Sequence, residues 1–303
     1  MGFGWATRGG RASAPVAPAK RPAPLALPGM SPEVFARFSE LVQAQCGIKM
    51  PPTKQTMLEA RLRKRLRSLS VETFEEYGDL VFSDDCPEDE LVHLLDAVTT
   101  NKTDFFREGV QFEILLGHVL PSLAAAGVGT RSPLRAWSAG CATGEEAWTL
   151  AMTLEDFRGR CPEFRYHILA TDLSTRVLAT AARGVYPEER VLPVPERLRR
   201  AWFLRSRDRT RGLVRVAPEL RAHVDFRRLN FREPRELAGP PLDLIFCRNV
   251  LIYFDKEFQR ELLMRFCDRL PPGGHLFLGH TESIHGMDLP LVGLGHAVHR
   301  RVG

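Results

Sequence analysis

The sequence has few cysteines, and none of them lie close together in the chain. Its six cysteines include no Cys-x-x-Cys pair, and no histidine cluster has the spacing of metal ligands. The sequence therefore indicates neither a disulfide framework nor a zinc site, and we expect no metal. Nor does any segment approach the ~20 consecutive apolar residues of a membrane helix. The first residues lack a signal-peptide core, so we expect a cytoplasmic protein with no direct membrane insertion.

Acidic residues are absent from the first thirty positions. Four basic residues there, Arg8, Arg11, Lys20 and Arg21, supply most of the formal net charge of +5 and leave only +1 for the rest of the chain. The same segment is rich in Ala, Pro and Gly and lacks apolar periodicity, so we expect residues 1–30 to form a disordered tail. Basic character elsewhere must be judged locally.

Residues 31–98 have the pattern of an all-helical unit. Ser31 followed by Pro32 is typical of a helix start, and Gly47 ends that first helix. A second helix, about 54–68, has an apolar face and a strongly basic remainder in which Glu59 is the single acid. Further helices are expected at 73–82 and 88–99.

After residue 110, short apolar runs alternate with helical patterns. This alternation favours a mostly parallel α/β sheet with helices on both faces. Residues of about 198–230 depart from the rhythm, and the short runs 213–216 and 223–226 predict a small antiparallel β-subdomain over about 198–228.

The segment 137–146, Trp-Ser-Ala-Gly-Cys-Ala-Thr-Gly-Glu-Glu, follows a predicted strand and opens a helix. Small residues let a ligand approach the backbone there, and the N–H groups of the helix point toward it. Asp172, at the end of the next strand, would accept hydrogen bonds from ribose hydroxyls. Its spacing of 28 residues from Gly144 and the absence of Gly-x-Gly-x-x-Gly favour another adenosine-containing ligand over a dinucleotide. Alternatively, Asp172 caps the following helix, and both roles are compatible.

A third strand, within 242–247, ends at Arg248 and Asn249. Open α/β sheets bind ligands at the carboxyl ends of their strands, which makes these two residues site candidates. On local pattern alone, Asn249 also suits a turn and Tyr253 suits the core.

From Ser31 to the C-terminus, the sequence resembles the chemotaxis receptor methyltransferases, the CheR family. Five motifs occur in the family's order, at 99–107, 138–146, 170–172, 246–254 and 279–283. The resemblance implies an all-α N-terminal domain (31–98), a linker (99–110) and a Rossmann-like class I methyltransferase domain (111–303) with a small antiparallel β-subdomain. It also implies methyl transfer from S-adenosyl-L-methionine to glutamate carboxylates of chemoreceptors, with S-adenosyl-L-homocysteine as product.

Carried over position by position, the resemblance implies a cosubstrate site and two residues that orient the reacting groups. Arg107 and Tyr253 are the residues expected to orient these groups. Cosubstrate contacts are implied for Asn101, Thr103, Arg107, Glu145, Asp172, Asn230, Phe231, Asn249 and Val250.

The basic second helix would dock the receptor, since the family uses its helical domain for that purpose. The docking candidates are Arg61, Arg63, Lys64 and Arg67. A charged solvated face or attraction to nucleic acid would also suit these residues, but the resemblance favours the helical region of methyl-accepting receptors, with recruitment to membrane receptor arrays. Residues 204–213 keep Gly212 but place charged residues where some family members have glycines, which argues against tethering through a receptor C-terminal pentapeptide. Nothing in the sequence demands more than a monomer.

Two alternatives remain. One is a non-catalytic module that keeps the fold and binds the cosubstrate for signalling. The other is a methyltransferase that acts on a small molecule or a nucleic acid, which salt-dependent nucleic-acid binding would reveal.

Overall fold

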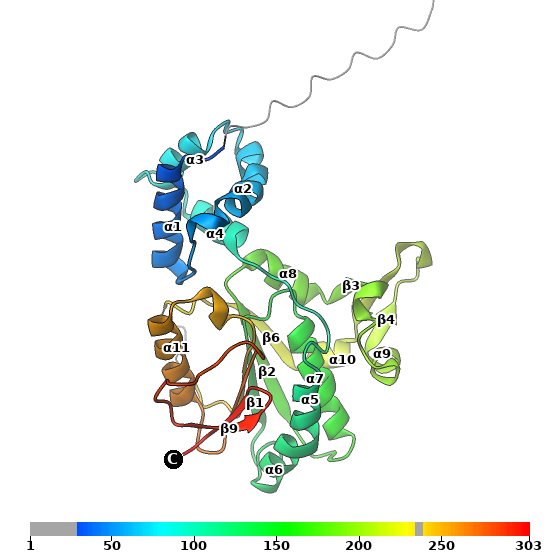
Figure 1. Ribbon diagram of the computed structural model, residues 1–303. Helices are drawn as coiled ribbons and strands as arrows, with labels where there is room; N and C mark the ends of the chain where they lie inside the picture. The colour runs from blue at the N-terminus through cyan, green and yellow to red at the C-terminus, as the bar shows by residue number, and fades with distance from the viewer. Residues whose placement is uncertain (1–28, 234–238) are drawn as a thin grey trace, which may run out of the picture.

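A computed structural model describes residues 29–233 and 239–303 and divides them between a helical unit and a larger α/β unit (Figure 1). Residues 1–28, most of the segment for which a disordered tail was predicted, lie outside the described residues. Met30, however, is buried in the helical core, and its N–H donates to Glu59 Oε1 at 3.1 Å. The helical unit therefore includes Met30, one residue before its predicted start.

The helical unit confirms the predicted elements to within a few residues. It contains α1 (Pro32–Cys46), η1 (Pro52–Lys54), α2 (Gln55–Leu69), α3 (Phe74–Val81) and α4 (Glu88–Val98). Local signals explain the boundaries of α1, since the Ser31 side chain accepts from the Val34 N–H and Gly47 adopts a left-handed conformation. Apolar residues of all four α-helices pack into one core that includes Phe38, Leu62 and Tyr77.

The α/β unit is built on a seven-stranded sheet in the order β6-β2-β1-β7-β8-β10-β9. Its strands are β1 (Leu134–Ala139), β2 (Tyr166–Asp172), β6 (Val224–Arg228), β7 (Leu244–Cys247), β8 (His275–Leu278), β9 (Leu291–Gly295) and β10 (Val298–Arg301). The first five in the sheet pair in parallel, and β10 and β9 add antiparallel pairs at one edge. Strand order reverses between β1 and its neighbours β2 and β7, which creates a crevice at their carboxyl ends.

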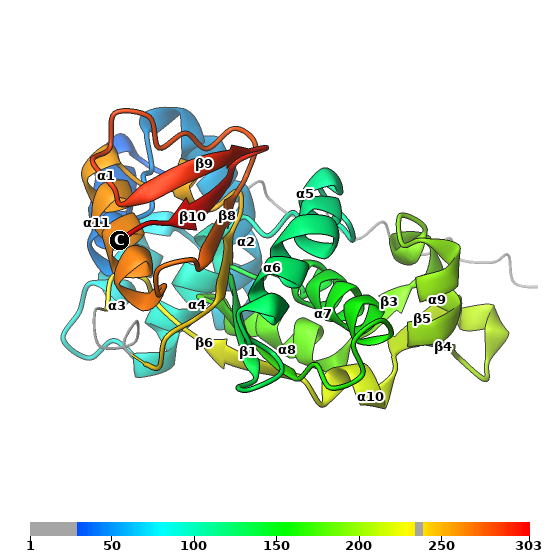
Figure 2. The same ribbon diagram turned by 90° about the horizontal axis from the view of Figure 1, so that it is seen from below.

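Helices cover both faces of this sheet (Figures 1 and 2). They are α5 (Val110–Ile114), the π-turn η2 (Leu115–Val119), α6 (Leu120–Ala125), α7 (Glu145–Arg158), α8 (Thr175–Arg183) and α11 (Lys256–Arg269). Successive side chains of a strand point to opposite faces, so the residues of β1 pack alternately into the two hydrophobic cores on either side of the sheet. Ala136 packs into the core that includes Ala151 of α7, and Trp137 packs with Phe266 of α11.

A second, three-stranded sheet projects from the body beside α9 (Glu196–Trp202), as Figure 2 shows. Its order is β3-β5-β4, from β3 (Val185–Pro187), β4 (Phe203–Arg205) and β5 (Leu213–Val216). Around it lie η3 (Glu188–Val191), η4 (Arg209–Arg211) and α10 (Pro218–Arg221). The predicted antiparallel subdomain is therefore confirmed for 213–216.

The prediction was wrong for 223–226, which was assigned to that subdomain. Val224–Arg228 is the edge strand β6 of the main sheet, where Val224 pairs in parallel with Ile168 of β2. Instead, the small sheet takes its third strand from Val185–Pro187, upstream of the predicted boundary. Both strands are too short for their pattern to reveal the partner, which lies far away in the sequence.

His275, the first residue of β8, makes stability depend on pH. Burial, together with nearby Arg300, lowers the pKa of His275 from 6.5 to about 4. The unfolded chain therefore binds a proton at a higher pH than the folded one, and this contribution to stability is complete above pH 6.5 and is lost as pH falls toward 4. We expect the free energy of unfolding of His275→Gln to fall less steeply over that interval in urea titrations. His285→Gln, at an exposed position, should keep the wild-type slope, and equal slopes for both variants would contradict the assignment.

Candidate functional site

A cavity of about 320 Å³ lies between the helical unit and the carboxyl ends of β1, β2, β6 and β7. Nine predicted site residues line it, namely Asn101, Thr103, Arg107, Asp172, Asn230, Phe231, Asn249, Val250 and Tyr253. They come from segments up to 152 positions apart in the chain, since Asn101 lies in the linker and Tyr253 in η5 (Leu251–Tyr253). The fold therefore brings together most of the residues that were singled out in the sequence.

The small-residue turn after β1 forms one wall. Gly140 has a φ of 89°, and a Cβ atom there would stand 2.5 Å from Val250 Cγ2. Ala142 also has positive φ, and its N–H donates to Asp172 Oδ2 at 2.9 Å. Such conformations are costly for residues other than glycine and cluster at functional sites. The turn thus brings backbone close to the cavity and is fastened to the end of β2.

Asp172 is a buried carboxylate that faces the cavity. Oδ1 accepts from the Ser174 N–H at 2.9 Å, and burial raises the pKa of Asp172 in spite of these backbone hydrogen bonds. Ser174, whose hydroxyl accepts from the Val177 N–H, is the N-cap of α8, so the alternative capping role for Asp172 is wrong. A carboxylate has acceptor sites beyond these two bonds, which leaves Asp172 able to accept from ligand hydroxyls.

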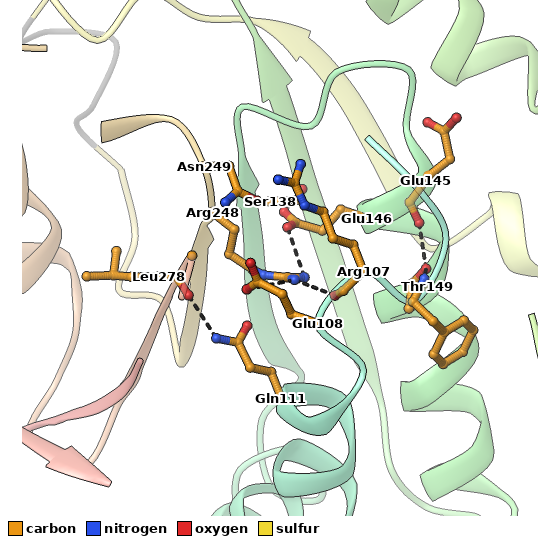
Figure 3. A network of polar contacts seen from close by, with 12 residues as sticks. Arg107, Glu108, Gln111, Ser138, Glu145, Glu146, Thr149, Arg248, Asn249 and Leu278 are labelled. Carbon is orange, nitrogen blue, oxygen red and sulfur yellow. Dashed lines mark hydrogen bonds and ion pairs between the residues drawn. The ribbon is translucent and has the colours of Figure 1, made fainter. Parts of the chain in front are cut away.

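A buried arginine that lines the cavity lies at the centre of a network of polar contacts (Figure 3). Arg248, at the end of β7, donates to the Arg107 carbonyl and lies 3.2 Å from Glu108 Oε2 and 3.4 Å from Glu146 Oε2. Although burial alone would raise it, the attraction of Arg248 holds the pKa of Glu108 below its usual range. At Glu146 burial prevails and raises the pKa. Arg248 thereby joins the linker, β7 and α7.

Glu145 is the one predicted cosubstrate residue that does not line the cavity, whereas its neighbour Glu146 does. The Glu145 carboxylate is buried against Arg190 at 2.6 Å, and Arg190 also donates to the Thr103 carbonyl and to Asp104. Glu145 therefore holds the linker through Arg190. Neighbouring helical residues point about 100° apart, so the choice between two adjacent glutamates depends on how α7 meets the sheet.

The helical unit supplies the opposite wall. The Lys49 N–H donates to the Tyr253 carbonyl at 2.9 Å, and Asn230 Nδ2 donates to the Gln45 carbonyl at 2.7 Å. Lys54, which lines the cavity, lies with Nζ 5.7 Å from the centre of the Tyr253 ring. Burial, with a contribution from Arg61, lowers the pKa of Lys54. In the sequence, Lys54 was only one member of a run of basic residues, and nothing indicated that it lines a cavity.

The four basic residues predicted as docking residues differ in their surroundings. Arg61 donates to the carbonyls of Val98 at 2.6 Å and Thr99 at 2.9 Å and to the Thr100 hydroxyl. It therefore fixes the end of α4 and the start of the linker. Arg63 is half-buried beside Glu59 and the Phe74 ring, whereas Lys64 and Arg67 are exposed. Of the four, only Lys64 and Arg67 are exposed, and Arg67 Nε also donates to the Arg63 carbonyl at 3.2 Å.

No group of three or more potential metal ligands occurs within residues 29–233 and 239–303. In the same residues, no helix is long and apolar enough to cross a membrane. The cavity combines a buried carboxylate at the end of β2 with the cationic residues Lys54, Lys102 and Arg107, of which Lys54 lies beside the Tyr253 ring. Such a site offers an acceptor to ligand hydroxyls and donors to an anionic group.

Comparisons with known proteins match both units. Residues 101–292 match the family described as CheR methyltransferase, SAM binding domain, and residues 33–99 match CheR methyltransferase, all-alpha domain. A chemotaxis protein methyltransferase of Escherichia coli K12 is 38% identical over 255 residues, which cover 84% of this chain and 85% of that protein. Chemotaxis protein methyltransferase 2 of Pseudomonas aeruginosa is 39% identical over 85% of this chain and 89% of its own length. A relative from Borreliella burgdorferi is 34% identical, over 83% and 88%.

Proposed function

Because the chain belongs to the CheR methyltransferase family, we propose that it transfers a methyl group from S-adenosyl-L-methionine to glutamate side chains of chemoreceptors. The observation that carries this proposal is the cavity in which Asp172, Asn249, Arg107 and Tyr253 meet. Arg107 and Asp172 come from two separate sequence motifs, and Asn249 and Tyr253 come from two parts of a third. All four were expected to belong to one site, and all four line the same cavity.

The residues present fit this cosubstrate. Asp172 offers acceptor oxygens for ribose hydroxyls, and the absence of a side chain at Gly140 lets Val250 pack against the turn that borders the cavity. Asn230 and Phe231 would line the pocket with Asn249, while Asn101 and Thr103 would reach it from the linker. When bound, S-adenosyl-L-methionine supplies an activated methyl group on a sulfonium.

The chain's own residues need not remove a proton from the acceptor. A glutamate has a reference pKa of about 4.3 and is already a carboxylate near neutral pH. Arg107 and the Tyr253 hydroxyl would orient that carboxylate for in-line attack, and the wall formed by the helical unit would exclude water. Catalysis would therefore rest on alignment and desolvation.

The proposal is tested by transfer of labelled methyl from S-adenosyl-L-methionine to membranes that contain the host's chemoreceptors. We expect label on the receptor that is released as methanol by base, because glutamate methyl esters are labile to base. Absence of label, with S-adenosyl-L-homocysteine still bound by the purified protein, would favour a non-catalytic signalling module. Label on another acceptor would redirect the substrate assignment.

Replacement of Gly140 by alanine tests the cosubstrate end of the cavity. The new Cβ would collide with Val250 Cγ2, and the left-handed backbone would be strained. We expect at least a tenfold weaker affinity for S-adenosyl-L-homocysteine in calorimetry, corresponding to about 1.4 kcal/mol. Gly273→Ala is the matched control, because its φ is also 89° and a Cβ added there would have no atom within 4 Å. Equal losses in both variants would assign the effect to backbone strain alone.

Receptor docking is assigned to the exposed basic residues of α2. We expect Lys64→Glu with Arg67→Glu to raise the KM for receptor about tenfold, through the repulsion of an acidic partner, and to leave cosubstrate affinity unchanged. Arg61→Ala should instead weaken cosubstrate affinity, because Arg61 holds the linker. If the double variant lost cosubstrate affinity as well, α2 would be structural. The arginine-rich turn between β4 and β5 leaves α2 as the proposed receptor contact, without a pentapeptide tether.

A further inference from the structure

A buried carboxylate follows β8 and does not itself line the cavity. Glu282 belongs to the motif 279–283 that the sequence singled out, and its side chain is 7% exposed. Oε2 accepts from the N–H groups of Gly279 at 2.6 Å and Asn249 at 2.9 Å. Oε1 accepts from the Leu251 N–H at 2.8 Å. A single side chain thus satisfies backbone donors from two segments about thirty positions apart.

One of these segments is the turn that enters the cavity. Because β7 and β8 are parallel neighbours, their carboxyl ends lie side by side, and Glu282 reaches from the end of β8 to the end of β7. Asn249 there has a φ of 60°, a conformation that costs energy for a residue other than glycine. The bond from its N–H to Glu282 helps to hold it in that conformation.

The same carboxylate replaces a missing helix cap. The 3₁₀ turn η5 begins at Leu251 and ends at Tyr253, and its own N-cap residue, Val250, makes no side-chain capping bond. The first N–H groups of such a turn need acceptors, and an anion at this end is favourable. Glu282 supplies the acceptor and the negative charge from a distant part of the chain. Because Tyr253 ends this turn, its placement depends on Glu282.

Gly279 completes the arrangement. A Cβ atom at this position would lie 2.5 Å from Asn249 Nδ2 and 2.9 Å from the Asn249 backbone nitrogen. The ends of β7 and β8 can therefore approach each other this closely only with glycine at 279. This close approach lets the Glu282 carboxylate accept hydrogen bonds from both strand ends.

We propose that Glu282 is a positioning residue that sets the location of Asn249, Val250 and Tyr253 by binding the backbone of their turn. Asn249, Val250 and Tyr253 all line the cavity, so the effect of Glu282 would extend to the proposed cosubstrate and acceptor contacts. The roles of these three residues rest on the proposed function. The anchoring itself rests on the three hydrogen bonds.

The test compares Glu282→Gln with Glu155→Gln in the intact chain. The amide of glutamine has one acceptor oxygen and would turn an NH₂ group toward a backbone N–H, so the three bonds cannot all persist. We expect affinity for S-adenosyl-L-homocysteine to fall about tenfold to a hundredfold, with a lower kcat and an unchanged KM for receptor. Glu155 is also partly buried and accepts from the Tyr166 hydroxyl, but it does not line the cavity. Its variant should match the wild type in affinity and kcat.

The conservative variant Glu282→Asp separates positioning from general support of the fold. Aspartate keeps the charge but is shorter by one methylene, so we expect an affinity for S-adenosyl-L-homocysteine between those of the wild type and Glu282→Gln. If Glu282→Gln does not fold, Glu282→Asp replaces it in the comparison. A lower unfolding temperature with wild-type affinity and kcat in the folded protein would overturn the proposal. If the wild type itself bound no S-adenosyl-L-homocysteine, the proposed function would fail instead.

Discussion

Arg107→Ala is expected to lower kcat for methyl transfer about a hundredfold while the protein stays folded. The Arg107 side chain lines the cavity, and one of its guanidinium N–H groups donates to the Lys102 carbonyl at 3.1 Å. The guanidinium carries further donors that can bind the acceptor carboxylate in a forked geometry. Losing a preorganised charged donor at the reacting group typically costs about 10²–10³ in rate. Initial rates at saturating cosubstrate measure the effect.

A comparison of Arg107→Lys with Arg107→Ala distinguishes orientation from simple attraction. Lysine restores the charge but not the planar fork, so we expect only partial recovery of kcat. Arg158→Ala is the control, because Arg158 pairs with Glu155 and does not line the cavity. Since the Arg107 carbonyl, and not its side chain, accepts from Arg248, the alanine variant leaves that contact in place. Wild-type kcat in Arg107→Ala would remove Arg107 from the mechanism.

Arg248→Met is expected to lower the free energy of unfolding by about 3–5 kcal/mol, the usual cost of removing one partner of a buried ion pair. The Arg248 side chain is 2% exposed, and it neutralises Glu108 and Glu146, whose side chains are 14% and 12% exposed. Without it, two carboxylates stay close together in a region of low polarity. Equilibrium unfolding in urea at neutral pH measures the loss.

The double variant Arg248→Met with Glu146→Gln tests this explanation. Neutralising Glu146 removes one of the uncompensated charges, so we expect it to recover part of the lost stability in the arginine variant. Arg200→Met breaks the exposed pair with Glu196 and should cost less than about 1 kcal/mol. A loss in Arg248→Met no larger than in Arg200→Met would show that the buried network contributes little to stability.

Local signals predicted most of the helices and strands. Ser31 and Gly47 bound α1, and the apolar face of α2 was evident from its spacing, because capping and periodicity act within a few residues. The strands that failed were short. The run 223–226 was predicted for the small sheet but belongs to the main sheet, and Val185–Pro187, for which no strand was predicted, completes the small sheet. The pairing of a short strand depends on a partner far away in the sequence.

The candidate site divides in the same way. The residues that follow β1, β2 and β7 were recognised from the sequence, because in an open α/β sheet the ends of parallel strands meet at one edge. Glu146 and Lys54 were missed, and Glu145 was preferred to Glu146. The sequence pattern alone cannot show which of two adjacent helical residues, or which member of a run of basic residues, lines a cavity. Arg61 was predicted for docking, but its hydrogen bonds hold the linker.

By itself, the sequence determined the order of the elements, the motifs that end three central strands and the excess of positive charge on α2, all of which are encoded within short segments. The tertiary structure alone decided which of two adjacent glutamates faces the cavity, which strand completes each sheet, and that Glu282 binds the turn before Tyr253. These features depend on contacts between residues far apart in the chain. Their geometry follows from how helices and strands pack together, and local sequence does not specify it.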